Sequence, residues 1–418
     1  MKIIFLSDNF PPYSLGGAGI VAYNLAKKLQ EKGHEIYIVS SVQKKNLQGA
    51  DNFKGLKVYR IYSNYHLRWQ AWLSLYNYQT VPVVRKIIKE IKPDIVHAHN
   101  IHSYLSYYSL KIAKKYSQAV FLTAHDAMAV NYGKVYPKYP NIIRKVGILD
   151  QIRAAKKRYN PFRNIVIRHY LKYTDKIFAV SNSLKELLEV NGIKNVATLY
   201  NGINIEEWRI SEKEVVEFKE RHDLQEKKVI LFGGRISGAK GGEVILRAMA
   251  FVVKAVQNAV LLIVGEGNFY DQTMIKLAKE LKIESSVRFT GWIQRDEMRR
   301  AFFSSDICVT PSIYLDPFNL LNIEAGAAGK PVIGTCFGGT PEIIINNQTG
   351  YIVNPLDIKA LAGRIVELLN GPIKARSFGE AGCKRVREHF TLDRQVEEIM
   401  HYYLKAIRPP LVVNQTHI

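Results

Sequence analysis

Two acidic side chains in the second half of the chain, Asp316 and Glu324, have a spacing that suits a polar ligand. Asp316 lies beside proline and asparagine in a segment typical of a loop, whereas Glu324 falls about one turn inside a predicted helix. Carboxylates placed in this way accept hydrogen bonds from hydroxyl groups at the two ends of a ligand, and the helix N-terminus between them can hold phosphate. This layout fits a nucleotide sugar.

Glycine-rich loops with basic residues form a second group of candidates. Gly234 and Arg235 follow a predicted strand, and Lys240 comes just before a predicted helix. Two cations beside glycine-rich backbone at a helix N-terminus are suited to a diphosphate. In the first half, Gly16 and Gly17 belong to the loop after the first predicted strand, where backbone without side chains can approach a ligand closely.

Strands that alternate with amphipathic helices must position these loops. The apolar runs predict strands at residues 2–6, 35–40, 95–98, 119–123 and 176–180, and again at 229–232, 260–264, 287–290, 307–310, 331–334 and 351–353. Such alternation favours parallel sheets covered on both faces, so we predict an α/β protein with two Rossmann-like domains. We expect the first domain over residues 1–205 and the second over 206–390, with a final helix within 391–418. In such sheets ligands bind beyond the carboxyl ends of the strands.

Three local expectations accompany this division. Residues 103–116 are predicted to form one helix, and Ser183 with Glu186 has the spacing of a capping box for the next. Residues 130–170 fit neither a strand period nor a helix period, which indicates an excursion from the first domain.

The charge is concentrated in the first half of the chain. The whole chain has a net charge of +22, and residues 1–205 contain 31 lysines and arginines against 11 aspartates and glutamates. Such an excess favours an anionic partner, namely a membrane surface, a phosphorylated acceptor or nucleic acid. The chain has no apolar run long enough to span a bilayer, and its three cysteines lack metal-site or disulfide spacing. We therefore expect a cytoplasmic protein.

Aromatic residues are interspersed among the bases in two segments. One is the excursion at 130–170, and the other is residues 65–78, which include Trp69 and Trp72. Aromatic rings beside cations are typical of segments that lie at a membrane interface. We therefore predict peripheral contact with an anionic membrane.

Several motifs of this sequence together resemble the retaining glycosyltransferases of family GT4. They are Pro11-Pro12 with Gly16-Gly17-Ala18-Gly19, Thr123-Ala124-His125-Asp126, Tyr200-Asn201-Gly202, Gly234-Arg235 with Lys240-Gly241, Asp316-Pro317-Phe318 with Glu324-Ala325, Gly338-Gly339-Thr340-Pro341-Glu342, and Thr349-Gly350-Tyr351. The resemblance covers almost the whole chain and implies the GT-B fold, in which two Rossmann-like domains face each other across a cleft. It also implies that the donor binds mainly to the second domain and the acceptor mainly to the first, and that the C-terminal helix crosses back.

The resemblance also implies roles for individual residues. It gives a catalytic set consisting of His125, Arg235, Lys240 and Asp316. It gives a substrate-binding set consisting of Gly16, Gly17, Gly234, Phe318, Asn319, Leu320 and Glu324. Within these sets Glu324 would bind the ribose, Arg235 and Lys240 the diphosphate, and His125 the transferred sugar. Two positions depart from the family pattern, because Asp316 replaces the usual Glu and Asn319 the usual Gly.

These implications together predict a metal-independent retaining glycosyltransferase without a cofactor. It would move a hexosyl group from a UDP- or GDP-sugar to a lipid-linked or polysaccharide-precursor acceptor at the inner face of the cell membrane. One alternative is the same donor chemistry on a soluble acceptor, and another is an inactive GT-B binding module that acts as a scaffold. Nucleic acid is not expected as a partner.

Overall fold

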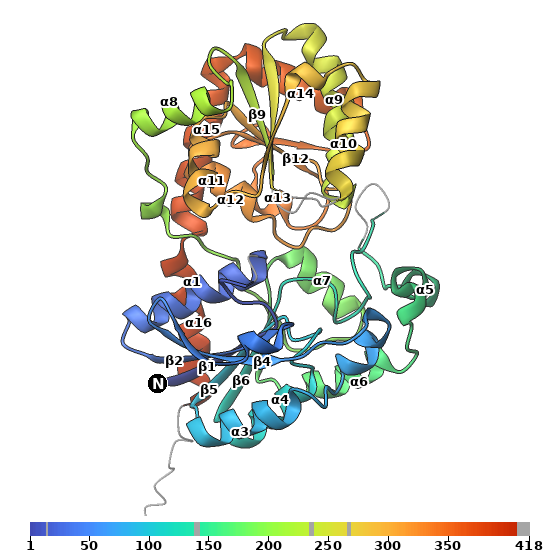
Figure 1. Ribbon diagram of the computed structural model, residues 1–418, viewed down its shortest axis with the longest axis vertical. Helices are drawn as coiled ribbons and strands as arrows, with labels where there is room; N and C mark the ends of the chain where they lie inside the picture. The colour runs from blue at the N-terminus through green and yellow to red at the C-terminus, as the bar shows by residue number, and fades with distance from the viewer. Residues whose placement is uncertain (14–15, 138–142, 234–237, 266–268, 408–418) are drawn as a thin grey trace, which may run out of the picture.

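The computed structural model describes residues 1–13, 16–137, 143–233, 238–265 and 269–407. Figure 1 shows two α/β domains, one above the other along the long axis, each built on a sheet with helices on both of its faces. This arrangement confirms the predicted fold of two Rossmann-like domains.

The sheet of the first domain has the strand order β3-β4-β2-β1-β5-β6-β7-β8. Its strands are β1 (Lys2–Ser7), β2 (Glu35–Val42), β3 (Gly49–Phe53), β4 (Leu56–Tyr62), β5 (Ile95–His99), β6 (Ala119–Ala124), β7 (Lys176–Ala179) and β8 (Val196–Thr198). Neighbouring strands are parallel except β3 and β4, which form an antiparallel hairpin at the edge. The strand order reverses between β1 and β5.

The sheet of the second domain is parallel throughout, with the order β11-β10-β9-β12-β13-β14. Its strands are β9 (Lys228–Gly233), β10 (Ala259–Val264), β11 (Val287–Gly291), β12 (Ile307–Thr310), β13 (Val332–Thr335) and β14 (Gly350–Val353). Every residue of β10 is buried, as expected for a strand covered by helices on both faces. The order reverses between β9 and β12, where ligands bind in sheets of this kind.

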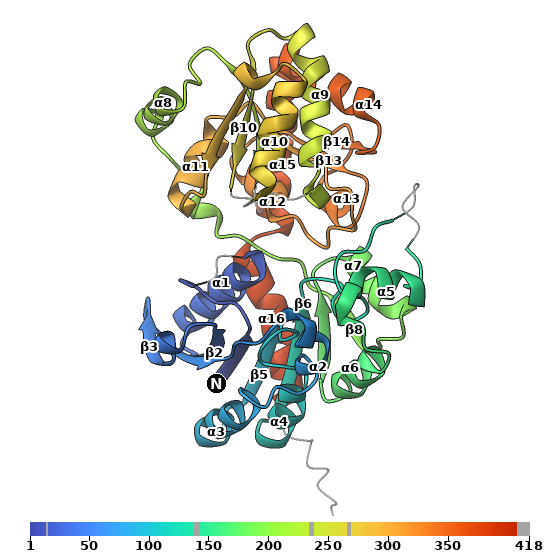
Figure 2. The ribbon, with the colours of Figure 1, turned by 45° about the vertical axis from the view of Figure 1, so that its right-hand side comes forward.

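Helices cover both sheets, as Figure 2 shows from a second direction. Those of the first domain are α1 (Gly17–Glu31), α2 (Gln70–Leu73), α3 (Val81–Ile91), α4 (Tyr108–Tyr116), α5 (Ile148–Ala155), α6 (Arg163–Leu171) and α7 (Asn182–Val190). Those of the second domain are α8 (Glu212–Arg221), α9 (Gly242–Ala255), α10 (Phe269–Glu280), α11 (Arg295–Phe303), α12 (Leu320–Ala327), α13 (Thr340–Ile343), α14 (Ile358–Asn370) and α15 (Pro372–His389).

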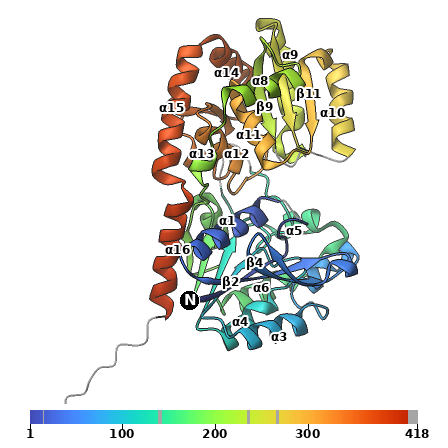
Figure 3. The same cartoon turned by 60° about the vertical axis from the view of Figure 1, so that its left-hand side comes forward.

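The last helix, α16 (Leu392–Ile407), returns to the first domain. Figure 3 shows α15 along the second domain and α16 continuing beside the first. Val396, Ile399 and Tyr403 are fully buried there, and the Tyr403 ring lies 5.0 Å from that of Phe121. The Tyr403 hydroxyl is also hydrogen-bonded to Nδ1 of His97, at 2.6 Å. The predicted return of the C-terminal helix is therefore confirmed.

The chain crosses between the domains twice, and the two crossings are hydrogen-bonded to each other. The N–H of Ile203 donates to the carbonyl of Phe390 at 3.0 Å, and the N–H of Leu392 donates to the carbonyl of Ile203 at 2.9 Å. The N–H of Gly202 donates to Oε1 of Gln395, also at 3.0 Å. The two crossings therefore form one compact hinge.

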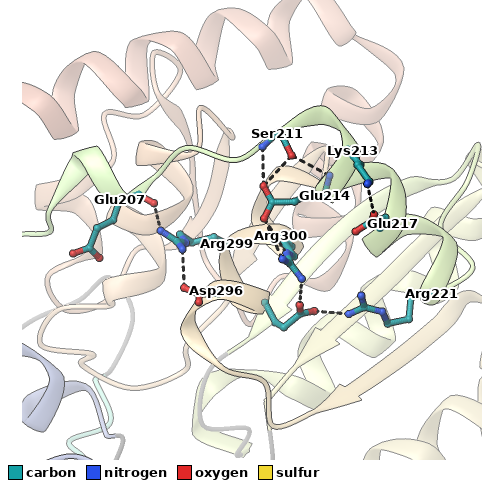
Figure 4. Close-up of polar contacts among 10 residues, drawn as sticks. Glu207, Ser211, Lys213, Glu214, Glu217, Arg221, Asp296, Arg299 and Arg300 are labelled. Atoms are coloured by element: carbon teal, nitrogen blue, oxygen red, sulfur yellow. Dashed lines mark hydrogen bonds and ion pairs between the residues drawn. The ribbon is translucent and has the colours of Figure 1, made fainter. Parts of the chain in front are cut away.

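The segment that follows the first crossing is held against α11 of the second domain (Figure 4). Arg299 donates to the carbonyl of Glu207, and Arg300 forms an ion pair with Glu214 at 3.1 Å. Ser211 and Glu214 form a capping box at the start of α8. Exposed pairs of this kind contribute only about 0–1 kcal/mol each. Together they attach this segment to the second domain.

Two of the predicted helix starts were wrong. In each case a side chain that the prediction did not consider accepts the backbone N–H groups there. Helix α4 begins at Tyr108 because the buried Asp8 carboxylate accepts the backbone N–H groups of the three residues 103–105, at 2.6–2.9 Å. The cap of α7 is Ser181, whose hydroxyl accepts the N–H of Leu184 at 3.1 Å, so Ser183 does not form the capping box.

Residues 130–170 are more regular than expected. They contain α5, the 3₁₀ helix η3 (Lys156–Arg158) and most of α6. These helices are short, and Ile148 and Leu149 of α5 are exposed although they are apolar. The apolar residues of this segment therefore show no clear helical period in the sequence.

We expect Gly202→Ala to destabilise the hinge. A carbon atom added to Gly202 would lie 2.2 Å from the carbonyl oxygen of Thr391, so the two crossings would have to separate. The expected loss is about 1–3 kcal/mol of unfolding free energy, seen as a lower Tm.

Gly363→Ala is the matched control for this variant. Gly363 is exposed within α14, with no neighbouring group within 4 Å of an added carbon. Alanine is the better helix former by about 0.5–1 kcal/mol, so this variant should gain stability. Thermal unfolding of both proteins measures the difference, and equal Tm values would contradict the close packing of the hinge.

Candidate active site

The loops after β9 and β12 meet at the point where the strand order of the second domain reverses. Gly241, at the end of the first loop, has φ +85°, and a carbon atom added to it would lie 2.1 Å from the carbonyl oxygen of Pro311. The N–H of Ile313 donates to the carbonyl of Ala239 at 2.9 Å. Only glycine permits this approach, which places the two loops in direct contact.

This contact brings two predicted catalytic residues together. Lys240 Nζ lies 2.6 Å from Oδ2 of Asp316, whose side chain is only 4% exposed. The Ser312 hydroxyl donates to the same oxygen at 3.1 Å. A buried carboxylate needs such partners to remain charged. The pair therefore fixes a cation and an anion at the carboxyl end of the sheet.

Helix α12 starts directly after Asp316. Asn319 is its N-cap, and the side-chain oxygen of Asn319 accepts the N–H of Leu321 at 3.4 Å. The residue that departs from the family's usual glycine is thus a favourable cap. Phe318 is buried, with its ring 6.2 Å from that of Tyr200 and 6.0 Å from that of Phe390, at the hinge.

Glu324 lies one turn inside α12, as its position in the sequence predicts. Burial raises the pKa of its carboxyl group, and the Arg295 guanidinium acts in the opposite direction. Within the described part of the chain, no side chain or backbone group is hydrogen-bonded to this carboxylate. Its oxygens are therefore free to accept hydrogen bonds from a ligand.

The first domain presents the N-terminus of α1 to this site. Gly16 is the N-cap and Gly17 the first helical residue, and the first turn has no acidic side chain. A carbon atom added to Gly17 would lie 3.4 Å from Cδ1 of Leu320, across the domain boundary. The structure thus brings Gly16, Gly17 and Leu320 together, with the positive end of a helix dipole beside α12.

His125 follows β6 and belongs to a group of buried histidines. Its Nε2 is hydrogen-bonded to Nδ1 of His99 at 2.9 Å, and the two rings are stacked with centroids 5.2 Å apart. Burial lowers the pKa of His125 to about 4, although the neighbouring Asp126 acts in the opposite direction. The imidazole is therefore neutral at pH 7 and can exchange hydrogen bonds with hydroxyl groups.

Tyr314 contacts residues of both domains, and no motif or spacing in the sequence indicated it. Its ring lies 5.8 Å from Lys240 Nζ in the second domain and 5.0 Å from Lys134 Nζ in the first. Burial raises the pKa of its hydroxyl, and the carboxylates of Asp316 and Asp126 raise it further. Lys240 and Asp316 of the second domain and Asp126 of the first, which adjoins His125, therefore all act on this side chain.

Glu342 makes a second contact between the domains. Its carboxylate accepts the backbone N–H groups of Asn182 and Ser183, at 2.7 and 2.8 Å, and the hydroxyl of Tyr200 at 2.9 Å. The N–H of Gly339, in the same motif, donates to the carbonyl of Asp316 at 2.8 Å. The motif was visible in the sequence, but its role in joining the domains was not.

Two predicted residues, Gly234 and Arg235, lie outside the described residues. Among the residues that are described, there is no group of three or more side chains suited to hold a metal ion. None of the described helices is both long and apolar enough to span a bilayer.

Comparisons with known proteins cover most of the chain. Residues 15–207 match the model of Glycosyltransferase Family 4, and residues 214–385 match that of Glycosyl transferases group 1. An uncharacterized glycosyltransferase of Methanocaldococcus jannaschii is 28% identical over 417 residues, which are 97% of this chain and 99% of the relative. N-acetyl-alpha-D-glucosaminyl L-malate synthase of Bacillus anthracis is 26% identical over 410 residues, which are 94% of this chain and 95% of the relative.

A solved structure shows the same fold. The crystal structure of HepE from Anabaena in complex with UDP has a TM-score of 0.73 at 17% identity, and the match covers 97% of this chain and 100% of HepE. With one family model on each domain and both domains of the GT-B fold, the chain belongs to the GT4-type glycosyltransferases.

Proposed function

We propose that this glycosyltransferase moves a hexosyl group from a nucleotide-diphosphate sugar, with UDP or GDP as the nucleotide, to an acceptor at a membrane surface. The observation that carries the donor assignment is the Lys240–Asp316 ion pair just before α12, near the Glu324 carboxylate, which accepts no hydrogen bond from the described residues. A cation, a helix N-terminus and two carboxylates in this order suit a diphosphate flanked by hydroxyl groups. HepE, which has the same fold, is known with UDP bound.

The proposed reaction retains the configuration of the anomeric carbon. The acceptor hydroxyl oxygen forms a bond to this carbon on the face from which the diphosphate oxygen departs, and the hydroxyl proton passes to the leaving diphosphate. Negative charge grows on the diphosphate, where Lys240, together with Arg235, would stabilise it. Asp316 would accept hydrogen bonds from the donor sugar. His125, whose Nε2 is bonded to His99, would direct Nδ1 to a sugar hydroxyl.

A surface of the first domain supports the membrane part of the proposal. Large exposed apolar side chains occur on or beside four short elements, namely the 3₁₀ helix η2 (Leu67–Trp69), α2, α5 and the start of α6. They are Leu67, Trp69, Trp72, Ile148, Leu149, Ile152, Phe162 and Ile165. We call this set the interfacial surface. Figure 2 shows α2, α5 and α6 on the same side of the first domain.

Two segments far apart in the sequence are joined beneath this surface. The Arg158 guanidinium donates to the side-chain oxygen of Gln70, and Ala71 packs with Tyr132 and Ala155 in a small core. Exposed apolar residues beside lysines and arginines are typical of a helix that lies at the headgroup level of a bilayer. The protein is therefore proposed to bind peripherally at the inner face of the cell membrane.

We expect Glu324→Ala and Lys240→Ala to affect different kinetic parameters. Glu324→Ala removes ribose contacts present in both ground and transition states, so the Kd of the nucleotide should rise about tenfold with little change in kcat. Lys240→Ala removes a cation whose partner charge grows in the transition state, so kcat should fall about 100-fold. Steady-state kinetics with a panel of UDP- and GDP-sugars, and calorimetry with the nucleotides, measure both.

The control for Lys240→Ala is Lys254→Ala, an exposed lysine in the last turn of the same helix, α9. Its kinetics should match those of the wild type. Thermal unfolding of each variant separates lost catalysis from the cost of leaving Asp316 without its partner. Small and equal changes in kcat and Kd for Glu324→Ala and Lys240→Ala would overturn the donor assignment.

For the membrane, we expect the wild type to float with anionic vesicles at low salt and to leave them at high salt. Each lysine or arginine near an anionic surface contributes about 1 kcal/mol, and 1 M salt shortens the screening length to about 3 Å. The triple variant Ile148→Ser, Leu149→Ser, Ile152→Ser keeps the charge but loses apolar insertion, so its partition coefficient should fall at least tenfold.

Exposed apolar residues of the second domain provide the matched control. Val216, Leu356 and Ile373 are 53%, 61% and 87% exposed, and their triple serine variant should float like the wild type. A wild-type protein that ignores anionic vesicles would contradict the membrane proposal and favour a soluble acceptor, which the name of the Bacillus anthracis relative suggests for that enzyme.

A further inference from the structure

We propose that a basic cavity in the first domain binds a phosphate or diphosphate group of the acceptor. This inference rests on the proposed function, because it assigns the acceptor's chemistry. The cavity has a volume of about 580 Å³ and lies between residues 131–137 and residues 144–158. That size is within the range of small-ligand sites, which is about 300–1,000 Å³.

The lining of the cavity is strongly positive. Its basic residues are Lys134, Arg144, Lys145, Arg153, Lys156 and Arg158, and its single acidic residue is Asp150. Asp150 is also the only acidic residue between positions 127 and 174, a range with eleven lysines and arginines. Four of these bases form no ion pair with any residue that the structure describes, namely Arg144, Lys145, Arg153 and Lys156. A positive charge of this density attracts a ligand with more than one negative charge.

The floor of the cavity is a built structure rather than a group of mobile surface lysines. Tyr132 is 4% exposed, and its hydroxyl donates to the carbonyl of Asn160 at 2.7 Å and accepts the N–H of Asn160 at 3.0 Å. Beneath it the Arg163 guanidinium is stacked 4.6 Å from the Tyr132 ring. Arg158 is held by Gln70 and by the carbonyl of Ala155. Its guanidinium also donates to the carbonyls of Tyr132 and Ala154, so Arg158 stabilises the floor, and a phosphate would be bound by the bases around it.

The cavity adjoins the donor site. Leu315 of the second domain lines it, and the N–H of Leu315 donates to the carbonyl of Val135 at 2.8 Å. The next residue is Asp316, and adjacent Cα atoms are about 3.8 Å apart. Lys134, at the cavity, and Lys240, at the donor site, face the same Tyr314 ring.

Two separate anionic groups can therefore be held side by side. The donor diphosphate has its own cation in Lys240 and its own helix N-termini, so the second set of bases is left for the acceptor. An acceptor phosphate in the cavity would hold a neighbouring hydroxyl near the sugar bound at Asp316, which is the positioning that glycosyl transfer requires.

The test measures binding of inorganic pyrophosphate to the full chain by calorimetry, with UDP at saturation so that the donor site is filled. The wild type should bind pyrophosphate. The double variant Arg153→Ala, Lys156→Ala should bind it at least tenfold more weakly, with the Kd of UDP unchanged. The matched control is Arg85→Ala, Lys89→Ala, two exposed bases of α3 outside the cavity, which should bind both ligands like the wild type.

Competition identifies the source of the phosphate. Displacement of pyrophosphate by glucose 6-phosphate supports a soluble phosphorylated acceptor, and displacement by a short-chain phosphatidic acid below its micellar concentration supports a lipid phosphate. Absence of pyrophosphate binding to the UDP-bound wild type would overturn the inference, as would equal binding by the wild type and the Arg153/Lys156 variant.

The test also separates this inference from the donor assignment. If the wild type binds UDP but not pyrophosphate, only the cavity assignment fails. If it does not bind UDP, the donor assignment fails, and the loss of pyrophosphate binding in the Arg153/Lys156 variant still tests the cavity.

Discussion

The buried ion pair between Lys240 and Asp316 is the interaction on which the rest of the site depends. A carboxylate that is 4% exposed would be costly to keep ionised without a cation and a hydroxyl donor. Gly241 lets the two loops come close enough for this pairing, and the backbone of Asp316 is in turn bonded to Gly339. A donor diphosphate would share Lys240 with Asp316. The lysine is therefore held ready for its ligand rather than recruited from solvent, which lowers the cost of binding.

The same loop also joins the domains. Leu315 is bonded to Val135, Tyr314 faces lysines of both domains, and Leu320 approaches Gly17. Together with the contacts of Glu342, these interactions describe a closed arrangement of the two domains. The hinge is short because two crossings of the chain are paired. Closure about such a hinge can bring the first domain's residues to the donor without altering either sheet.

Much of the fold followed from periodicity. Fully buried strands such as β10 produce uninterrupted apolar runs, so the parallel sheets and the order of elements were predicted from the sequence. The exposed hairpin strand β3 has no such run and was missed, as were its partner β4 and the three-residue strand β8. Helix α4 was predicted too long because Asp8, about a hundred residues away in sequence, takes the N–H groups of its predicted first turn. A long-range contact of this kind leaves no periodic trace.

For the site, sequence spacing placed Asp316 and Glu324 on a loop and a helix, and the resemblance to a family supplied the roles. The pairing of Lys240 with Asp316 could not be predicted, because 76 residues and three strands separate them in the chain. The contact between residues 65–78 and residues 130–170 could not be predicted from the sequence either. It depends on Gln70 and Ala71, which have no distinctive chemistry. Tyr314 was one of many tyrosines in the chain.

A crystal structure of the protein with bound UDP tests the central claim most directly. The account predicts the ribose hydroxyls within hydrogen-bonding distance of the Glu324 carboxylate, and the diphosphate between Lys240 and the N-terminus of α1 at Gly17. The basic cavity between residues 131–137 and residues 144–158 should remain without nucleotide. A nucleotide bound in that cavity, or in the second domain away from Lys240 and Glu324, would contradict the account.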